Sequence, residues 1–128
     1  MNVPTKMRME INEIPQAAER LIRSSKLMVE EMSSRLKDAD PFLIATIARG
    51  SSDHAAGFLK YAIELQLGLP VASLGPSVAS VYGAQLKMPR SATIAISQSG
   101  KSPDIIAMAE NAKRGGSLTL ALTNVISS

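Results

Sequence analysis

Short apolar runs without a charged residue recur along the chain and predict the strands of a buried sheet. They cover residues 42–48, 70–74, 92–96 and 118–122, and their polar members are serine and threonine only. Such runs are typical of strands buried on both faces, as in a parallel sheet between two layers of helices. We therefore expect these strands to be parallel.

Helical patterns occupy the segments between these runs. Residues 11–37 carry apolar side chains at steps of three and four. This spacing predicts an amphipathic helix that begins near Pro15 and ends before Asp38. Further helices, the first of them apolar nearly all round and the second weak, are predicted over residues 53–67, 77–86 and 103–114.

Strands that alternate with helices indicate an α/β fold. We predict three layers, αβα, around a flavodoxin-like parallel sheet with strand order 2-1-3-4. Residues 15–128 would form this domain, and residues 1–14 an N-terminal segment. Because only residues 123–128 follow the last predicted strand, we expect a sheet truncated after its fourth strand. The chain would then be the front part of a longer protein.

Two serine-rich turns, residues 50–52 and 97–102, follow the first and third predicted strands. Ligands of such sheets bind at the carboxyl ends of the strands where the order reverses, which is between these two strands. Each turn also opens a helix, whose N-terminus offers unpaired N–H groups and about +0.5 charge. The turns therefore predict a phosphate site. Its donors would be Ser51, Ser52, Ser97, Gln98, Ser99 and Ser102, with auxiliary roles for Gly50, Gly100 and Lys101.

These turns have two simpler interpretations. Serine often caps helices, so Ser52 and Ser102 could serve in that way alone. Residues 95–102 also resemble a P-loop with alanine in the first glycine position. However, Ala95 completes a predicted strand and Pro103 removes a donor at the helix start, which disfavours a nucleoside triphosphate site.

Other polar residues beside the turns remain outside the predicted site. Asp53 and Asp104 lie in the first turns of their helices, where the helix dipole is a sufficient explanation. Arg49 is compatible with a phosphate contact or with an interface carboxylate. His54, the only histidine, is interpreted as a polar residue near a helix start, and a substrate contact stays open. We predict neither a metal nor a cofactor.

Composition excludes several classes of function. The net charge is +3, and no cluster of Lys and Arg with aromatic residues supports a nucleic-acid surface. The chain has no cysteine, which excludes a disulfide scaffold and a thiolate nucleophile. Neither a secretion signal nor an apolar run of about 20 residues occurs. We expect a soluble, cytoplasmic protein without a nucleic-acid or membrane partner.

The two turns resemble those of the sugar isomerase (SIS) domain family. Members carry Gly-Thr/Ser-Ser after the first strand and Ser-Gln-Ser-Gly-Glu-Thr after the third. This chain has Gly50-Ser51-Ser52 and Ser97-Gln98-Ser99-Gly100-Lys101-Ser102. The resemblance is strongest to the first SIS domain in the isomerase half of glucosamine-6-phosphate synthases and of their glutaminase-lacking relatives, the glucosamine-6-phosphate deaminases.

This resemblance implies that Ser52, Ser97, Gln98, Ser99 and Ser102 hold a phosphate and that Ser51 lies near the sugar's reactive end. It implies a homodimeric isomerase, deaminase or aminotransferase-like enzyme acting on fructose 6-phosphate or glucosamine 6-phosphate. The family's acid–base groups lie mainly in a second SIS domain, which would follow residue 128. The catalytic residues are therefore unknown, and this chain alone is expected to be inactive. The alternative is a non-catalytic module that senses a phosphosugar.

Overall fold

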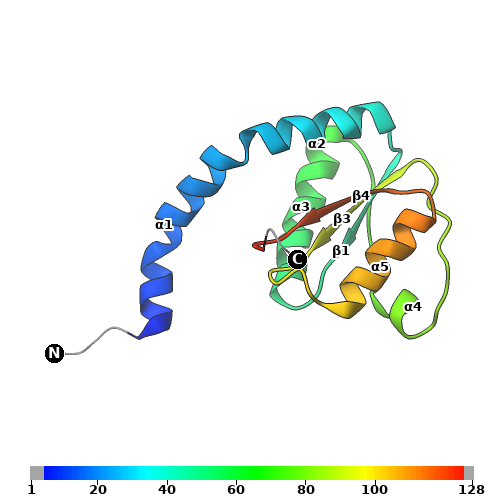
Figure 1. Cartoon of the computed structure of the whole chain (residues 1–128). Coiled ribbons are helices and arrows are strands. Elements are labelled where there is room, and N and C mark those ends of the chain that lie inside the picture. The colour runs from blue at the N-terminus through cyan, green and yellow to red at the C-terminus, as the bar shows by residue number, and fades with distance from the viewer. Residues whose placement is uncertain (1–4, 126–128) are drawn as a thin grey trace. The chain divides into compact units, whose positions relative to one another are not determined.

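The apolar runs form a parallel sheet in a computed structural model, which describes residues 5–125 (Figure 1). Its strands are β1 (Leu43–Ile47), β2 (Val71–Ser73), β3 (Ser91–Ile96) and β4 (Leu118–Leu122). They pair in the order β2-β1-β3-β4, and each pair is parallel. The predicted strand order is confirmed, and β1 and β3 are neighbours.

Helices cover both faces of the sheet, so the predicted three-layer α/β fold is confirmed (Figure 1). They are α3 (Ser51–Leu67) on one face, and α4 (Ser77–Ser80) with α5 (Pro103–Arg114) on the other. Strand residues pack toward opposite layers: Ile44 contacts the cluster of Ile63 from α3, and Ile47 that of Met108 from α5.

Burial decreases from the middle of the sheet toward its edge. Residues 44–48 of β1 and its continuation are buried. In β4 no residue is fully buried, and Ala121 and Leu122 are exposed. Burial on both faces was predicted for every strand, and for β4 this is wrong. The reason is that β4 lies at the edge, with a neighbour on one side only within residues 5–125.

The N-terminal helical segment begins earlier than predicted. It consists of α1 (Lys6–Ser24) and α2 (Lys26–Ala39). The backbone N–H of Arg8 donates to the Thr5 hydroxyl at 3.3 Å, so Thr5 is the N-cap. Pro15 lies inside α1, and the predicted start at this residue is wrong. An N-cap followed by good helix formers outweighs the single backbone bond that a proline removes.

Contacts within the chain divide it into two compact units. The first reaches Arg35, and the second begins at Leu36 and contains the sheet with α3, α4 and α5. Leu36 packs against the apolar cluster of Ile44 and Ile63. The domain boundary predicted between residues 14 and 15 stays a prediction. The helices described in residues 5–125 include none with the length and apolar character needed to cross a membrane.

The helix predicted over residues 77–86 is shorter than expected. Only Ser77–Ser80 is helical, as α4. Gly83 has a φ of 61°, which a helix does not contain. Beyond it the buried side chain of Asn111 binds the backbone of the following residues, donating to the carbonyl of Ala84 at 2.8 Å. These contacts replace the hydrogen bonds of further helical turns.

Candidate functional site

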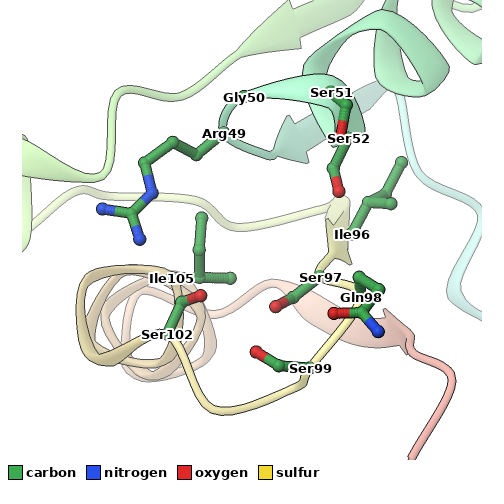
Figure 2. A pocket seen from close by; sticks show the side chains of 10 residues that line it. All are labelled: Arg49, Gly50, Ser51, Ser52, Ile96, Ser97, Gln98, Ser99, Ser102 and Ile105. Atoms are coloured by element: carbon green, nitrogen blue, oxygen red, sulfur yellow. The ribbon is translucent and has the colours of Figure 1, made fainter. Parts of the chain in front are cut away.

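The two serine-rich turns face each other across a cavity at the carboxyl ends of β1 and β3 (Figure 2). The cavity has a volume of about 250 Å³. It is lined by Arg49, Gly50, Ser51, Ser52, Ile96, Ser97, Gln98, Ser99, Ser102 and Ile105. The convergence predicted from the strand order therefore exists in the structure.

The first turn is made by Gly50, which has a φ of 62° and a ψ of −134°. Few residues other than glycine adopt this conformation, and it turns the chain directly from β1 into α3. The carbonyl of Gly50 accepts a bond from the N–H of Asp53 at 3.1 Å. The N–H groups of Ser51 and Ser52 belong to the first turn of α3, where no intrahelical acceptor exists. They are available to a ligand in the cavity.

The second turn is held in shape by its own serines. The Ser97 hydroxyl accepts a bond from the N–H of Gly100 at 3.2 Å, and the Ser99 hydroxyl accepts one from the N–H of Lys101 at 3.2 Å. Because a hydroxyl can accept and donate at once, both keep their own proton for a ligand. Gly100, with a φ of 63°, allows the chain to turn back on itself.

The turn is also tied to β4. The N–H of Ser97 donates to the carbonyl of Leu122 at 3.1 Å, and the carbonyl of Gln98 accepts from the N–H of Asn124 at 3.3 Å. These bonds extend the pairing of β3 with β4 past the end of the strands. The polar groups of the turn are therefore positioned by the sheet before any ligand is present.

Helix capping does not account for these serines. Ser52 lies inside α3, whose N-cap is Gly50. Ser102 is the N-cap of α5, but its hydroxyl makes no capping hydrogen bond. In the part of the chain that the structure describes, no hydrogen bond engages the hydroxyls of Ser51, Ser52 or Ser102. Figure 2 shows the hydroxyls of Ser52, Ser97, Ser99 and Ser102 directed into the same space.

Two residues given auxiliary roles do not line the cavity. The N–H of Gly100 is engaged by Ser97, and the Lys101 side chain is exposed. Conversely, Arg49 does line it, although the sequence left its role open. Its Nη1 atom lies 2.8 Å from Oδ2 of Asp104, a residue left outside the predicted site. A charged residue beside a glycine turn was a signal for Arg49, but nothing in the sequence indicated its partner.

The P-loop interpretation fails on the course of the backbone. Ala95 and Ile96 are paired with Ala121 and Leu122 of β4, so they belong to a strand. A P-loop needs these positions in an open loop around the phosphates.

His54 is exposed and is not among the residues that line the cavity. No group of three or more His, Asp or Glu residues within 5–125 could hold a metal ion.

Comparisons with known proteins find relatives of this chain. The model of the SIS domain family matches residues 37–128. The glutamine–fructose-6-phosphate aminotransferase (isomerizing) of Caldanaerobacter subterraneus subsp. tengcongensis is 35% identical over 127 residues, with 93% of this chain and 20% of that protein covered.

Two solved structures extend the likeness. A candidate phosphosugar isomerase from Silicibacter pomeroyi DSS-3 is 56% identical and superposes with a TM-score of 0.93, over 98% of this chain and 38% of that one. The C-terminal domain of glucosamine-fructose-6-phosphate aminotransferase from Francisella tularensis shares the fold, with 23% identity and a TM-score of 0.82 over 99% and 37% of the two chains. This chain thus spans about a fifth of the curated relative and less than two fifths of either structure.

Proposed function

This chain belongs to the SIS domain family, and from that premise we propose that its cavity binds the phosphate group of a sugar phosphate. The groups that would hold the phosphate are the side chains of Ser52, Ser97, Gln98, Ser99 and Ser102 with the N–H groups at the start of α3. Ser51, at the first position of α3, would lie near the reactive end of the sugar.

The convergence on one cavity of hydroxyls that can still donate to a ligand is the observation that carries this proposal. Hydroxyls come from both turns, and two helices, α3 and α5, begin at its wall. A phosphate oxygen accepts several hydrogen bonds, and helix N-termini favour negative charge by about 0.3–1 kcal/mol each when exposed. A neutral ligand would use the hydroxyls but gain nothing from the helix dipoles.

We further propose that the chain is the first SIS domain of an enzyme that interconverts aldose and ketose phosphates. Fructose 6-phosphate and glucosamine 6-phosphate are the proposed substrates, with isomerisation, deamination or amino transfer as the reaction. Proton transfer between C1 and C2 needs a positioned base. Among the described residues no carboxylate or imidazole lines the cavity, so in this proposal the cavity anchors the substrate and the base lies outside the lining residues.

The same lack of a base in the lining favours one alternative, a module that binds a phosphosugar without converting it. The full-length protein distinguishes the two. Interconversion of fructose 6-phosphate and glucosamine 6-phosphate, or of an aldose and a ketose phosphate, supports the enzyme. Binding without turnover of any of them supports the sensing module.

We also propose a homodimer in the cytoplasm.

Thermal unfolding tests the phosphate site directly. Fructose 6-phosphate or glucosamine 6-phosphate at about 100 times its Kd should stabilise the chain by about 2.7 kcal/mol. Replacing Ser97 and Ser99 together by alanine should abolish this shift, because two donors to the phosphate and the two bonds that shape the turn are lost. Ser73→Ala is the matched control, since Ser73 also lies at the carboxyl end of a strand but does not line the cavity.

Ligand controls complete the experiment. Fructose and glucosamine without phosphate should leave the unfolding temperature unchanged, and so should ATP with magnesium. Equal stabilisation by the unphosphorylated sugars would contradict a phosphate site. Equal stabilisation by ATP with magnesium would contradict a sugar phosphate as the ligand.

A further inference from the structure

Arg49 holds a position that the assigned donors leave unexplained. Of the described residues that line the cavity, it is the only one with a charged side chain. It directly precedes Gly50, at the point where the chain leaves β1. Figure 2 shows its side chain extending toward the start of α5, with the guanidinium to one side of the space into which the serine hydroxyls point. A full positive charge thus lies beside a set of donors that are otherwise neutral.

Asp104 fixes the guanidinium at this place. Its Oδ2 atom pairs with Nη1 of Arg49 at 2.8 Å, while its Oδ1 atom accepts a bond from the N–H of Ile105 at 3.0 Å. The Asp104 side chain is 23% exposed and the Arg49 side chain 62%. The carboxylate is therefore anchored on the first turn of α5, and the arginine is paired with it at one side of the cavity.

The guanidinium has donors to spare. An arginine side chain carries five N–H donors in a rigid planar fork. Only the contact with Asp104 engages them among residues 5–125. Arg49 can keep this ion pair and still donate to a ligand oxygen. Bonds from a charged donor to a charged acceptor are about twice as strong as neutral ones, and their strength grows with the charge on the acceptor.

We propose that Arg49, oriented by Asp104, is a specificity-determining residue that makes this cavity select a dianionic sugar phosphate over anions of lower charge. This rests on the proposed function, in which the cavity binds a sugar phosphate. The serine hydroxyls and backbone N–H groups form similar bonds to a phosphate and to a sulfate ester. The charge of Arg49 discriminates between them, because a phosphate monoester carries nearly two negative charges at pH 8 and a sulfate ester one.

Isothermal titration at pH 8 with glucosamine 6-phosphate and glucosamine 6-sulfate tests this role. Arg49→Gln should weaken 6-phosphate binding by about 10- to 100-fold, as expected for one lost charge-assisted bond. It should weaken 6-sulfate binding less, so the Kd for the 6-sulfate divided by the Kd for the 6-phosphate should fall. Arg114→Gln is the matched control, because it removes the same charge at the other end of α5. It should leave the ratio unchanged.

A double variant separates direct contact from neutralisation of Asp104. If Arg49 donates to the phosphate, Arg49→Gln combined with Asp104→Asn still binds the 6-phosphate more weakly than the wild type, because the direct bond is lost even when the repulsion by Asp104 is removed. Recovery of wild-type affinity in the double variant would overturn the proposal, because Arg49 would then only screen the carboxylate. Circular dichroism of each variant without ligand verifies that the fold is retained.

The outcome also distinguishes this inference from the proposed function. An unchanged ratio of Kd values in Arg49→Gln, with binding still abolished in the Ser97 and Ser99 variant, overturns the role of Arg49 and leaves the phosphate site intact. Failure of the wild-type chain to bind any 6-phosphate overturns the proposed function itself, and the role of Arg49 with it.

Discussion

Gly50 joins the fold to the site, because the conformation that ends β1 also aims the first turn of α3 at the cavity. A Cβ atom built on Gly50 would meet nothing within 4 Å, so replacement by a larger residue is opposed by backbone conformation alone. Gly57, in the middle of α3, is equally open, but it has helical backbone. The two glycines therefore differ in backbone φ and not in the room that a Cβ atom would have.

We expect Gly50→Ala to lower the free energy of unfolding by roughly 1–3 kcal/mol, the cost of a sparsely populated conformation. Gly57→Ala should instead raise it by about 0.5–1 kcal/mol, because alanine loses less backbone entropy in a helix. Urea unfolding of both variants and the wild type measures the difference. A neutral Gly50→Ala would mean that the turn relaxes into another conformation, which contradicts its role in fixing the site.

The serines of the site could be predicted from the sequence, whereas the ion pair could not. Each serine follows a recognisable strand, and the rule for parallel sheets brings both strand ends to one edge. The contact of Arg49 with Asp104 depends on the direction of two side chains from different elements. No pattern in the sequence encodes that direction, and Asp104 alone is fully explained as an acidic residue in a first turn.

Among the secondary-structure elements, α5 fixes the long connection between β2 and β3. Asn111 is 3% exposed, and its Oδ1 atom accepts a bond from the N–H of Leu86 at 3.1 Å. Its Nδ2 atom donates to the carbonyl of Ala84 at 2.8 Å. One side chain thus satisfies a donor and an acceptor of a segment that has no regular structure.

Asn111→Ala should lower the free energy of unfolding by about 3 kcal/mol, because each polar group left unpaired costs about 1–3 kcal/mol. Glu110→Ala is the control on the same helix. Glu110 is exposed, and its Oε2 atom lies 3.9 Å from Nη1 of Arg114. Its loss should therefore change the free energy of unfolding by less than about 0.5 kcal/mol. Chemical unfolding of both variants tests the assignment. Equal effects would show that Asn111 does not hold the connection.

The errors of the sequence-based prediction also lie in particular elements. Residues 77–86 have a helical pattern, but the conformation of Gly83 and the distant Asn111 end the helix after α4. Pro15 is typical of a helix start, but the cap at Thr5 places the start earlier. The end of each helix is set by a cap or by a tertiary hydrogen bond, and the spacing of apolar residues does not reveal either.

In the second unit as a whole, one helix presents apolar side chains on two opposite faces. The inward face of α3 contributes Ala56 and Ile63 to the core. Its outward face carries Phe58, Tyr61 and Leu65, which are 79%, 67% and 79% exposed. Their spacing of three and four residues makes one continuous stripe along the helix. Large aromatic and aliphatic side chains grouped in this way are typical of a protein interface.

We expect this stripe of Phe58, Tyr61 and Leu65 to take part in the proposed homodimer. Each aromatic side chain can bury about 150–250 Å², and a stable interface needs about 800 Å² per partner, so the stripe would form the centre of the contact. Phe58→Glu combined with Leu65→Glu should therefore shift the chain from dimer to monomer in sedimentation velocity. Val81→Glu, at another exposed apolar position, should leave the dimer intact. The double variant should still bind the sugar phosphate, because neither residue lines the cavity.

A wild-type chain that remains monomeric at high concentration would contradict the dimer. A double variant that still dimerises would exclude this stripe, because an interface centred on it cannot accommodate buried, unpaired carboxylates.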